Sequence, residues 1–195
     1  MKSVVRISIA TLLIVSLIGC APSYSLVKPA PTKVAAGSFH VQPTRPWNRA
    51  PKTPGEIREK EVWTLNGLML DGVTFIGGLK DGSAIEPQNA DQRVPEFRAS
   101  MLAHDLVSML ETYYRIHGVS VFETLSVAPR KFVGESGVQF DYAFIPADDV
   151  KRRGRAVMAI SNGKLYLMNL NGTAVHYFDA ALPEFEGLVD SAQVQ

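Results

Sequence analysis

The clearest helical pattern in the chain lies between residues 95 and 117. Apolar side chains recur there every three or four residues and fall on one face of a helix, while polar side chains such as Ser108 and Glu111 fall on the opposite face. Pro95 suits a first helical turn, and Gly118 suits the position after the last turn. The pattern therefore predicts one long amphipathic helix over residues 95–117.

Strand patterns dominate the chain after this helix. Residues 138–144 alternate between apolar and polar side chains, as a half-buried strand does. Residues 156–160 and 165–168 are apolar at every position and flank Asn162-Gly163, a pair typical of tight hairpin turns. We expect these two strands to lie in the middle of a sheet that is covered on both faces. A second pair, Asn66-Gly67, predicts another hairpin earlier in the chain.

Together these elements predict an α+β fold. Strands joined by tight turns run antiparallel. We expect a twisted antiparallel sheet of about six strands, covered by the long central helix and by a C-terminal helix over residues 180–189, despite Pro183 near the start of that helix. A domain of this size buries about two-thirds of its extended-chain surface. No cofactor is therefore expected to be needed to hold the fold.

The order of hairpins and helices resembles that of PsbP-like domains. The resemblance rests on the hairpin spacing and on the run Phe178-Asp179-Ala180-Ala181-Leu182, which leads into the last helix. PsbP-like domains have a central antiparallel sheet between helices, and most of them bind a partner or assist assembly without a shared catalytic residue. The resemblance thus implies a fold and a non-catalytic role, and it assigns no role to any position of this chain.

The first twenty residues form a separate pattern. Lys2 and Arg6 precede residues 7–18, an apolar stretch that is too short for the roughly 20 residues of a membrane span. It has the length of a signal-peptide core. The stretch ends in Leu17-Ile18-Gly19-Cys20, which contains the single cysteine of the chain and resembles the lipobox of bacterial lipoproteins. The alternative interpretation is an ordinary secretory signal with a chance cysteine.

The lipobox resemblance implies a cellular location and a partner. In this family the cysteine sulfur receives a diacylglycerol, and cleavage before it leaves an N-terminus that can be acylated. We therefore expect a signal peptide over residues 1–19, lipidation at Cys20 and the lipid bilayer as a partner. Ala21 takes the place of the Asp that commonly retains such proteins on the inner membrane. This favours the periplasmic side of the outer membrane, if the organism is Gram-negative.

A proline-rich segment follows the lipobox. Residues 21–55 contain seven of the twelve prolines and five Lys or Arg residues, with no Asp or Glu. Proline favours extended conformations, so we expect a basic tether over residues 20–55 and a single α+β domain over residues 56–195. The cations would either contact anionic headgroups or only keep the linker soluble. Alternatively the linker ends near residue 36, because residues 37–41 have the pattern of a short strand.

The overall composition excludes some classes of function. The chain has 195 residues, of which 46% are hydrophobic and 20% charged, as in ordinary globular domains. A net charge of +1 argues against a nucleic-acid partner. The four histidines include no pair at the i, i+4 spacing of a helical metal site, so no metal is expected.

One dense basic cluster stands out as a candidate binding site. Lys151, Arg152, Arg153 and Arg155 lie within five residues, in what we expect to be a hairpin loop. The cluster is either a site for an acidic envelope protein or for an anionic envelope component such as a lipid headgroup, or only a solvated turn.

No catalytic residue is assigned. The segment Gly134-Glu135-Ser136-Gly137 resembles the nucleophile region of chymotrypsin-like proteases, but the chain is too short for two barrels and the segment suits a polar turn. We therefore expect a membrane-anchored envelope lipoprotein with a non-catalytic binding or assembly role. The alternatives are a lipid-anchored envelope hydrolase and a sensor of a small ligand.

Overall fold

A computed structural model describes residues 23–89 and 93–194 of the chain. Eight strands form one antiparallel sheet in the spatial order β1-β4-β5-β6-β10-β9-β8-β7. The two halves of the sheet are joined by the pairing of β6 with β10, where Leu79 lies opposite Leu165. In chain order the strands of this sheet are β1 (Ser25–Val27), β4 (Trp47–Arg49), β5 (Lys60–Thr64), β6 (Asp71–Leu79), β7 (Val121–Phe132), β8 (Glu135–Ile145), β9 (Arg152–Ser161) and β10 (Lys164–Thr173).

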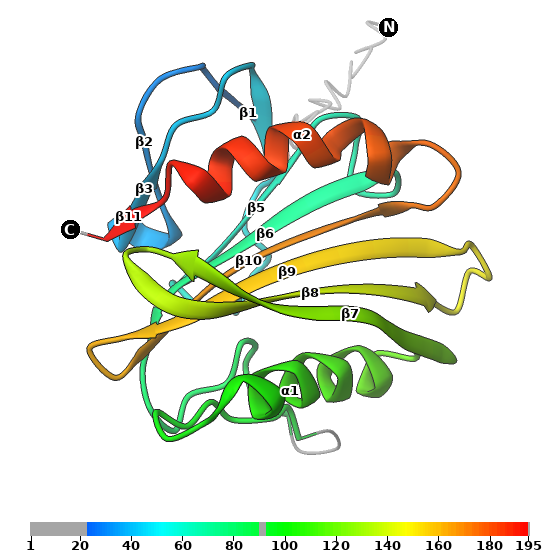
Figure 1. The fold of residues 1–195 in the computed structure, drawn as a ribbon. Helices are drawn as coiled ribbons and strands as arrows, with labels where there is room; N and C mark the ends of the chain where they lie inside the picture. Colours follow the sequence, from blue (N-terminus) through cyan, green and yellow to red (C-terminus); the bar gives the residue numbers. More distant parts are fainter. Residues whose placement is uncertain (1–22, 90–92, 195) are drawn as a thin grey trace, which may run out of the picture.

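The sheet lies between two helical layers (Figure 1). Helix α1 (Ala103–Ile116) packs on one face, and α2 (Tyr177–Asp190) packs on the other face. The α2 layer also contains a small three-stranded sheet of β2 (Thr32–Val34), β3 (Phe39–Val41) and β11 (Gln193–Val194), with the 3-10 turn η1 (Ala35–Gly37). The domain is therefore α+β, as predicted, with eight strands in the main sheet instead of about six.

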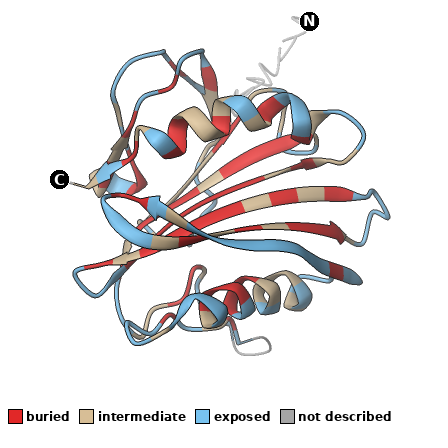
Figure 2. Ribbon diagram, in the orientation of Figure 1, coloured by how far each residue is buried: buried red, intermediate tan, exposed pale blue. Residues whose placement is uncertain are grey.

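The central hairpin of β9 and β10 explains why both of these strands are apolar throughout. Along β10, Leu165 and Leu167 pack in the core under α1, while Tyr166 and Met168 pack in the core under α2. Figure 2 shows the resulting buried band across the middle strands. Asn162 and Gly163 have φ values of 50° and 70°, the left-handed conformation that a two-residue hairpin turn requires. The prediction for this hairpin is confirmed.

The long helix is shorter than its apolar pattern indicated. α1 begins at Ala103, because the Asp105 carboxylate accepts a hydrogen bond from the Leu102 N–H at 2.8 Å and caps the helix there. The residues before it form a loop that bridges to Ala84 through Glu96. At the other end of the domain, α2 includes Pro183 and extends beyond the predicted range at its start.

Residues 25–49 belong to the folded domain, so the predicted tether differs from the structure from Ser25 onward. This segment supplies β1 to β4, and β1 pairs with β4 along the edge of the main sheet. The prolines lie in the connections, whereas Val34, Phe39 and Trp47 are buried in the α2 layer. Cys20 and the signal peptide lie outside the described residues.

The Asn66-Gly67 hairpin forms with a longer loop than a two-residue turn. The carboxylate of Asp71, which is fully buried, accepts hydrogen bonds from the Leu65 N–H at 2.7 Å, the Thr64 hydroxyl at 2.8 Å and the Asn66 amide at 2.6 Å. Residues 68–70 therefore form a turn, and β6 begins at Asp71.

Candidate functional site

The α1 face of the sheet changes from apolar to polar along β10. Leu165 and Leu167 point into the core under α1, and the next two residues of the same parity are Asn169 and Asn171. Asn169 is 4% exposed, so its amide is removed from water and needs partners within the protein. These two amides therefore mark a polar region beneath the C-terminal half of α1.

Two tyrosines satisfy the buried amide. The Tyr142 hydroxyl donates to Asn169 Oδ1 at 2.7 Å, and Asn169 Nδ2 donates to the Tyr114 hydroxyl at 3.0 Å. The two hydroxyls are 2.8 Å apart and close a triangle. Burial raises the pKa of Tyr114 and, together with the charge that Tyr114 would carry, raises the pKa of Tyr142 well above its usual range. All three groups are therefore neutral, and the triangle joins α1 to β8 and β10.

Gly154 on β9 makes room for the Tyr142 ring. The two residues are paired across β8 and β9, and a Cβ on Gly154 would lie 2.1 Å from Tyr142 Cζ. The ring lies flat enough over the sheet to stack on Phe122, with centroids 4.9 Å apart and an interplanar angle of 18°. The position of the triangle is thus fixed by a close approach that only glycine permits.

A cavity of about 160 Å³ opens beside the triangle, between α1 and the sheet. Its volume corresponds to about five water molecules at roughly 30 Å³ each, or to one amino-acid side chain. Its wall is mixed in chemistry. The apolar part is formed by Ile76, Ile85, Leu110 and Leu167, and the polar part by Lys60, Thr74, Tyr113, Tyr114, Asn169 and Asn171.

A carboxylate cluster lies next to this cavity. Glu86 accepts hydrogen bonds from the Tyr113 hydroxyl at 2.5 Å and from Lys60 Nζ at 3.1 Å, and its second oxygen lies 2.8 Å from His117 Nε2. Lys60 also lies 3.3 Å from Glu56. The cluster draws on β5, α1 and the loop before α1, so it connects the end of the helix to the sheet.

The charges of this cluster are set by their neighbours. Burial alone would raise the pKa of Glu86, but the Tyr113 hydrogen bond and the Lys60 ammonium outweigh burial and lower it. Burial, and then the hydrogen bond to Glu86, raise the pKa of Tyr113 far above its usual range. At neutral pH the phenol is therefore held protonated beside an ionised carboxylate. This arrangement suits hydrogen bonding and does not generate a nucleophile.

The predicted basic cluster is not a loop of free cations. Arg152, Arg153 and Arg155 lie in β9, and each guanidinium pairs with a carboxylate: Arg152 with Asp148 at 2.6 Å, Arg153 with Asp179 at 2.7 Å, and Arg155 with Asp141 at 2.6 Å and Glu186 at 2.7 Å. The bond to Asp141 raises the pKa of Arg155 still further. Lys151 is exposed, just before the strand. The residues that neutralise the arginines come from α2, β8 and the loop before β9.

The candidate groups under α1 have no local motif in the sequence. Glu86, Tyr113 and Asn169 are far apart in the chain and meet only through the sheet topology. One signal was present: Asn169 and Asn171 follow an apolar strand at alternate positions. An amide at a buried strand position requires a polar partner, so this alternation indicates a polar group in the core but does not identify its partners.

Two further features bear on the type of site. Within residues 23–89 and 93–194, no three His, Cys, Asp or Glu side chains converge as metal ligands would. Within the same ranges, no helix is both long enough and apolar enough to cross a bilayer.

Comparison with known proteins shows the fold of the chain but not its family or its function. No family model and no curated protein sequence matches the chain. The solution structure of CyanoP, the cyanobacterial PsbP of Synechocystis, is similar with a TM-score of 0.55 and 16% identity, over 90% of this chain and 94% of that chain. The predicted likeness to PsbP-like domains is therefore confirmed at the level of the fold.

Two more distant structures cover similar shares of the chain. One is the Ran-binding protein Mog1p of Saccharomyces cerevisiae, with a TM-score of 0.47 and 10% identity over 89% of this chain and 96% of that chain. The other is LpqN, described as involved in cell envelope biogenesis of Mycobacterium tuberculosis, with a TM-score of 0.33 and 9% identity over 91% and 87%. Similarity at this level does not bear on the function of this chain.

Proposed function

We propose that the protein is a membrane-anchored bacterial envelope lipoprotein with a non-catalytic binding or assembly role. The anchor is the lipid on Cys20, supported by the lipobox Leu17-Ile18-Gly19-Cys20. The binding site is the cavity under α1, and the observation that carries this role is its wall of mutually hydrogen-bonded neutral groups beside apolar side chains. Sites for small ligands typically combine apolar walls with a few fixed polar groups.

The size of the cavity limits what it binds. At about 160 Å³ it is smaller than the roughly 300–1,000 Å³ of sites for drug-sized molecules. It suits one side chain of a partner protein or one small molecule with both a polar and an apolar part. Asn171 and Thr74 supply polar groups at the wall, and Leu110 and Ile76 supply the apolar contact.

Binding is better supported than hydrolysis. His117 and Glu86 are adjacent, as in a general-base pair, but the hydroxyl bonded to Glu86 is the Tyr113 phenol. That phenol has a strongly raised pKa, so it is a poor nucleophile. The lipid-anchored hydrolase is therefore the less favoured alternative.

The anchor is tested by replacing its thiol. Cys20→Ser removes the group that accepts the lipid, so we expect the protein to leave the membrane fraction or to accumulate with its signal peptide uncleaved. Intact-mass analysis of the wild-type protein should show a chain that begins at residue 20 and carries the mass of acyl chains. A mature chain that begins elsewhere without lipid mass would disprove the anchor.

The cavity is tested by filling it. The lipidated protein is extracted from membranes with what it binds, and the bound molecules are identified by mass spectrometry for the wild type and for Thr74→Met. Thr74 lines the cavity, so the larger side chain should abolish capture. Thr112→Met, at an exposed position of α1, is the matched control and should capture the same molecules. Equal capture by both variants would show that the cavity is not the binding site.

A further inference from the structure

The folded domain starts close to the proposed anchor. Strand β1 begins at Ser25, five residues after Cys20. Five residues span at most about 17 Å in any conformation. If Cys20 carries the lipid, as proposed above, no long linker separates the domain from the bilayer. The surface around β1 is then the part of the domain that reaches the headgroups first.

The outer side of β1 exposes large apolar side chains to solvent. Tyr24 is 49% exposed and Leu26 is 64% exposed, while Val27, the last residue of β1, is buried. Side chains alternate along a strand, so Tyr24, Leu26 and Lys28 share the outward face. Tyrosine combines an apolar ring with a polar hydroxyl and is enriched where membranes meet water. The neighbouring Lys28 adds a cation, which anionic headgroups attract.

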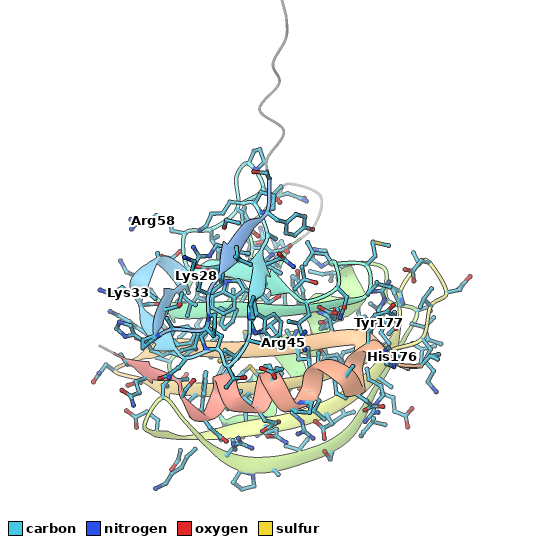
Figure 3. All side chains as sticks on the ribbon, turned by 90° about the horizontal axis from the view of Figure 1, so that it is seen from above. Lys28, Lys33, Arg45, Arg58, His176 and Tyr177 are labelled. Carbon is cyan, nitrogen blue, oxygen red and sulfur yellow. The ribbon has the colours of Figure 1, made fainter. Side chains whose placement is uncertain are left out.

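Cations without carboxylate partners surround this strand. Lys28, Lys33, Arg45 and Arg58 are exposed, and none of them forms an ion pair with any residue in the described part of the chain. Figure 3 shows Lys28, Lys33 and Arg58 around β1 and β2, with Arg45 on the same face nearer to α2. The arginines of β9 provide the contrast, because each of them is paired with a carboxylate.

We propose that this surface docks the domain onto anionic lipid headgroups. We call it the β1 face and define it by Tyr24, Leu26, Lys28, Lys33, Arg45 and Arg58. The cations bind the phosphates, and Tyr24 and Leu26 enter the interfacial region. Each cation near an anionic membrane contributes about a fivefold gain in binding. Figure 1 places β1 at the opposite end of the molecule from α1. Docking through the β1 face therefore leaves the cavity under α1 open to the aqueous side.

A single fluorescent label tests the docking. The lipidated protein with Ala30→Cys carries one free thiol, since Cys20 is acylated, in the exposed turn next to Lys28. It is labelled with an environment-sensitive dye and reconstituted into vesicles of phosphatidylglycerol or of phosphatidylcholine. We expect the emission of a dye in the bilayer interface in the anionic vesicles only, and we expect about 1 M salt to reverse it. A label at Ser136→Cys, on the exposed start of β8, should stay in water in both vesicles.

Charge reversal provides the matched comparison. In the Ala30→Cys protein, Lys28→Glu/Lys33→Glu/Arg58→Glu should lower the ratio of docked to undocked label by at least about a hundredfold, because three attractive charges are lost and three repulsive ones are added. Lys131→Glu/Lys151→Glu/Lys164→Glu changes the net charge equally at exposed sites away from the β1 face and should leave the ratio unchanged. Equal effects of the two triple variants would overturn the proposal that the β1 face docks on the membrane. Dye emission that does not change in anionic vesicles would overturn it as well.

The anchor and the docking fail in distinguishable ways. Intact mass is measured on every reconstituted sample. Lipid mass with no change in the label overturns the docking and leaves the anchor intact. An equal response in phosphatidylcholine vesicles overturns the role of the cations. Absence of lipid mass overturns the anchor, and the docking argument falls with it.

Discussion

The two faces of the sheet are packed by different chemistry. Under α2, the core is formed by aromatic rings such as Trp63 and Phe75, whose centroids are 4.7 Å apart, and the ion pairs of Arg155 with Asp141 and Glu186 lie at its rim. Under α1, polar groups lie inside the core, where Tyr114, Tyr142 and Asn169 bond one another beside a cavity. Adjacent residues of one strand, Met168 and Asn169, belong to the two different cores.

This difference separates stability from binding. Dense apolar packing gains free energy from every buried contact and leaves no room for a ligand. A polar, partly hollow core gives up some of that gain and holds hydrogen-bonding groups in fixed positions. The α2 face therefore contributes most to the stability of the domain, and the α1 face carries the cavity of the proposed binding site. Four predictions test this division.

The largest effect is expected in the aromatic core. Trp63 is fully buried, so Trp63→Ala should lower the free energy of unfolding by about 3–5 kcal/mol through lost burial and a large void. Leu110→Ala on the α1 face enlarges a cavity that already exists, so its cost should fall near the lower end of the usual range, about 2 kcal/mol. Urea denaturation measures both variants, and equal losses would contradict the division.

Substitution of one glycine on each face gives a second comparison, in which the two effects should have opposite signs. Gly154→Ala places a methyl group 2.1 Å from Tyr142 Cζ, so it should destabilise the domain by about 1–3 kcal/mol through overpacking. Gly187→Ala in α2 meets nothing within 4 Å and should stabilise the helix by about 0.5–1 kcal/mol. Thermal unfolding of the two variants should therefore shift in opposite directions. A neutral Gly154→Ala would show that Tyr142 is free to move.

Neighbours on β10 compare the faces within a single strand. Asn169→Leu removes a partner from each of two buried hydroxyls and should cost about 1–3 kcal/mol. Met168→Leu keeps an apolar side chain of similar volume and should cost less than about 1.5 kcal/mol. Adding Tyr114→Phe and Tyr142→Phe to Asn169→Leu removes the stranded hydroxyls and should recover part of the loss. Absence of recovery would show that the triangle acts through packing alone.

The smallest effect depends on pH. The pKa of Glu86 is lowered in the folded protein, so its ionisation stabilises the fold above the ordinary pKa of 4.5. This contribution is lost as the pH falls through the lowered folded-state pKa. Glu86→Gln lacks it and should lose less stability than the wild type on acidification, by about 1 kcal/mol or less. Denaturation curves between about pH 3 and pH 7 measure this, and parallel acid limbs would contradict it.

Local patterns predicted the elements that local contacts form. The hairpin at Asn162-Gly163 and the apolar face of α1 follow from turn chemistry and periodicity within a few residues. β3 matches the alternative in which residues 37–41 form a short strand. β1, β2 and β4 escaped prediction because each has only three residues close to prolines, and β1 pairs with β4 at a distance in the sequence. A three-residue strand carries too short an alternation to be distinguished from a linker.

The charge of the candidate sites depends on residues that are distant in the sequence. The cluster at Arg152, Arg153 and Arg155 has the composition of an exposed basic patch, and its neutralisation depends on Asp141, Asp179 and Glu186, which come from other elements. The same limit applies to Glu86 and Tyr113. Charge density along a chain does not indicate net charge in space when the counter-ions come from elsewhere in the fold.

The pairing of β6 with β10 affects the order in which the domain folds. Paired residues there, such as Leu79 and Leu165, are 86 positions apart, so forming this ladder closes a loop whose entropy cost is about 4 kcal/mol before any contact repays it. Folding of such topologies is slow compared with folding by local contacts. The chain emerges with β1 first, and the two halves of the sheet have no way to meet until β10 has followed. A polypeptide with this topology can form local pairs such as β7 with β8 earlier, but its main sheet becomes continuous only when β10 has been made.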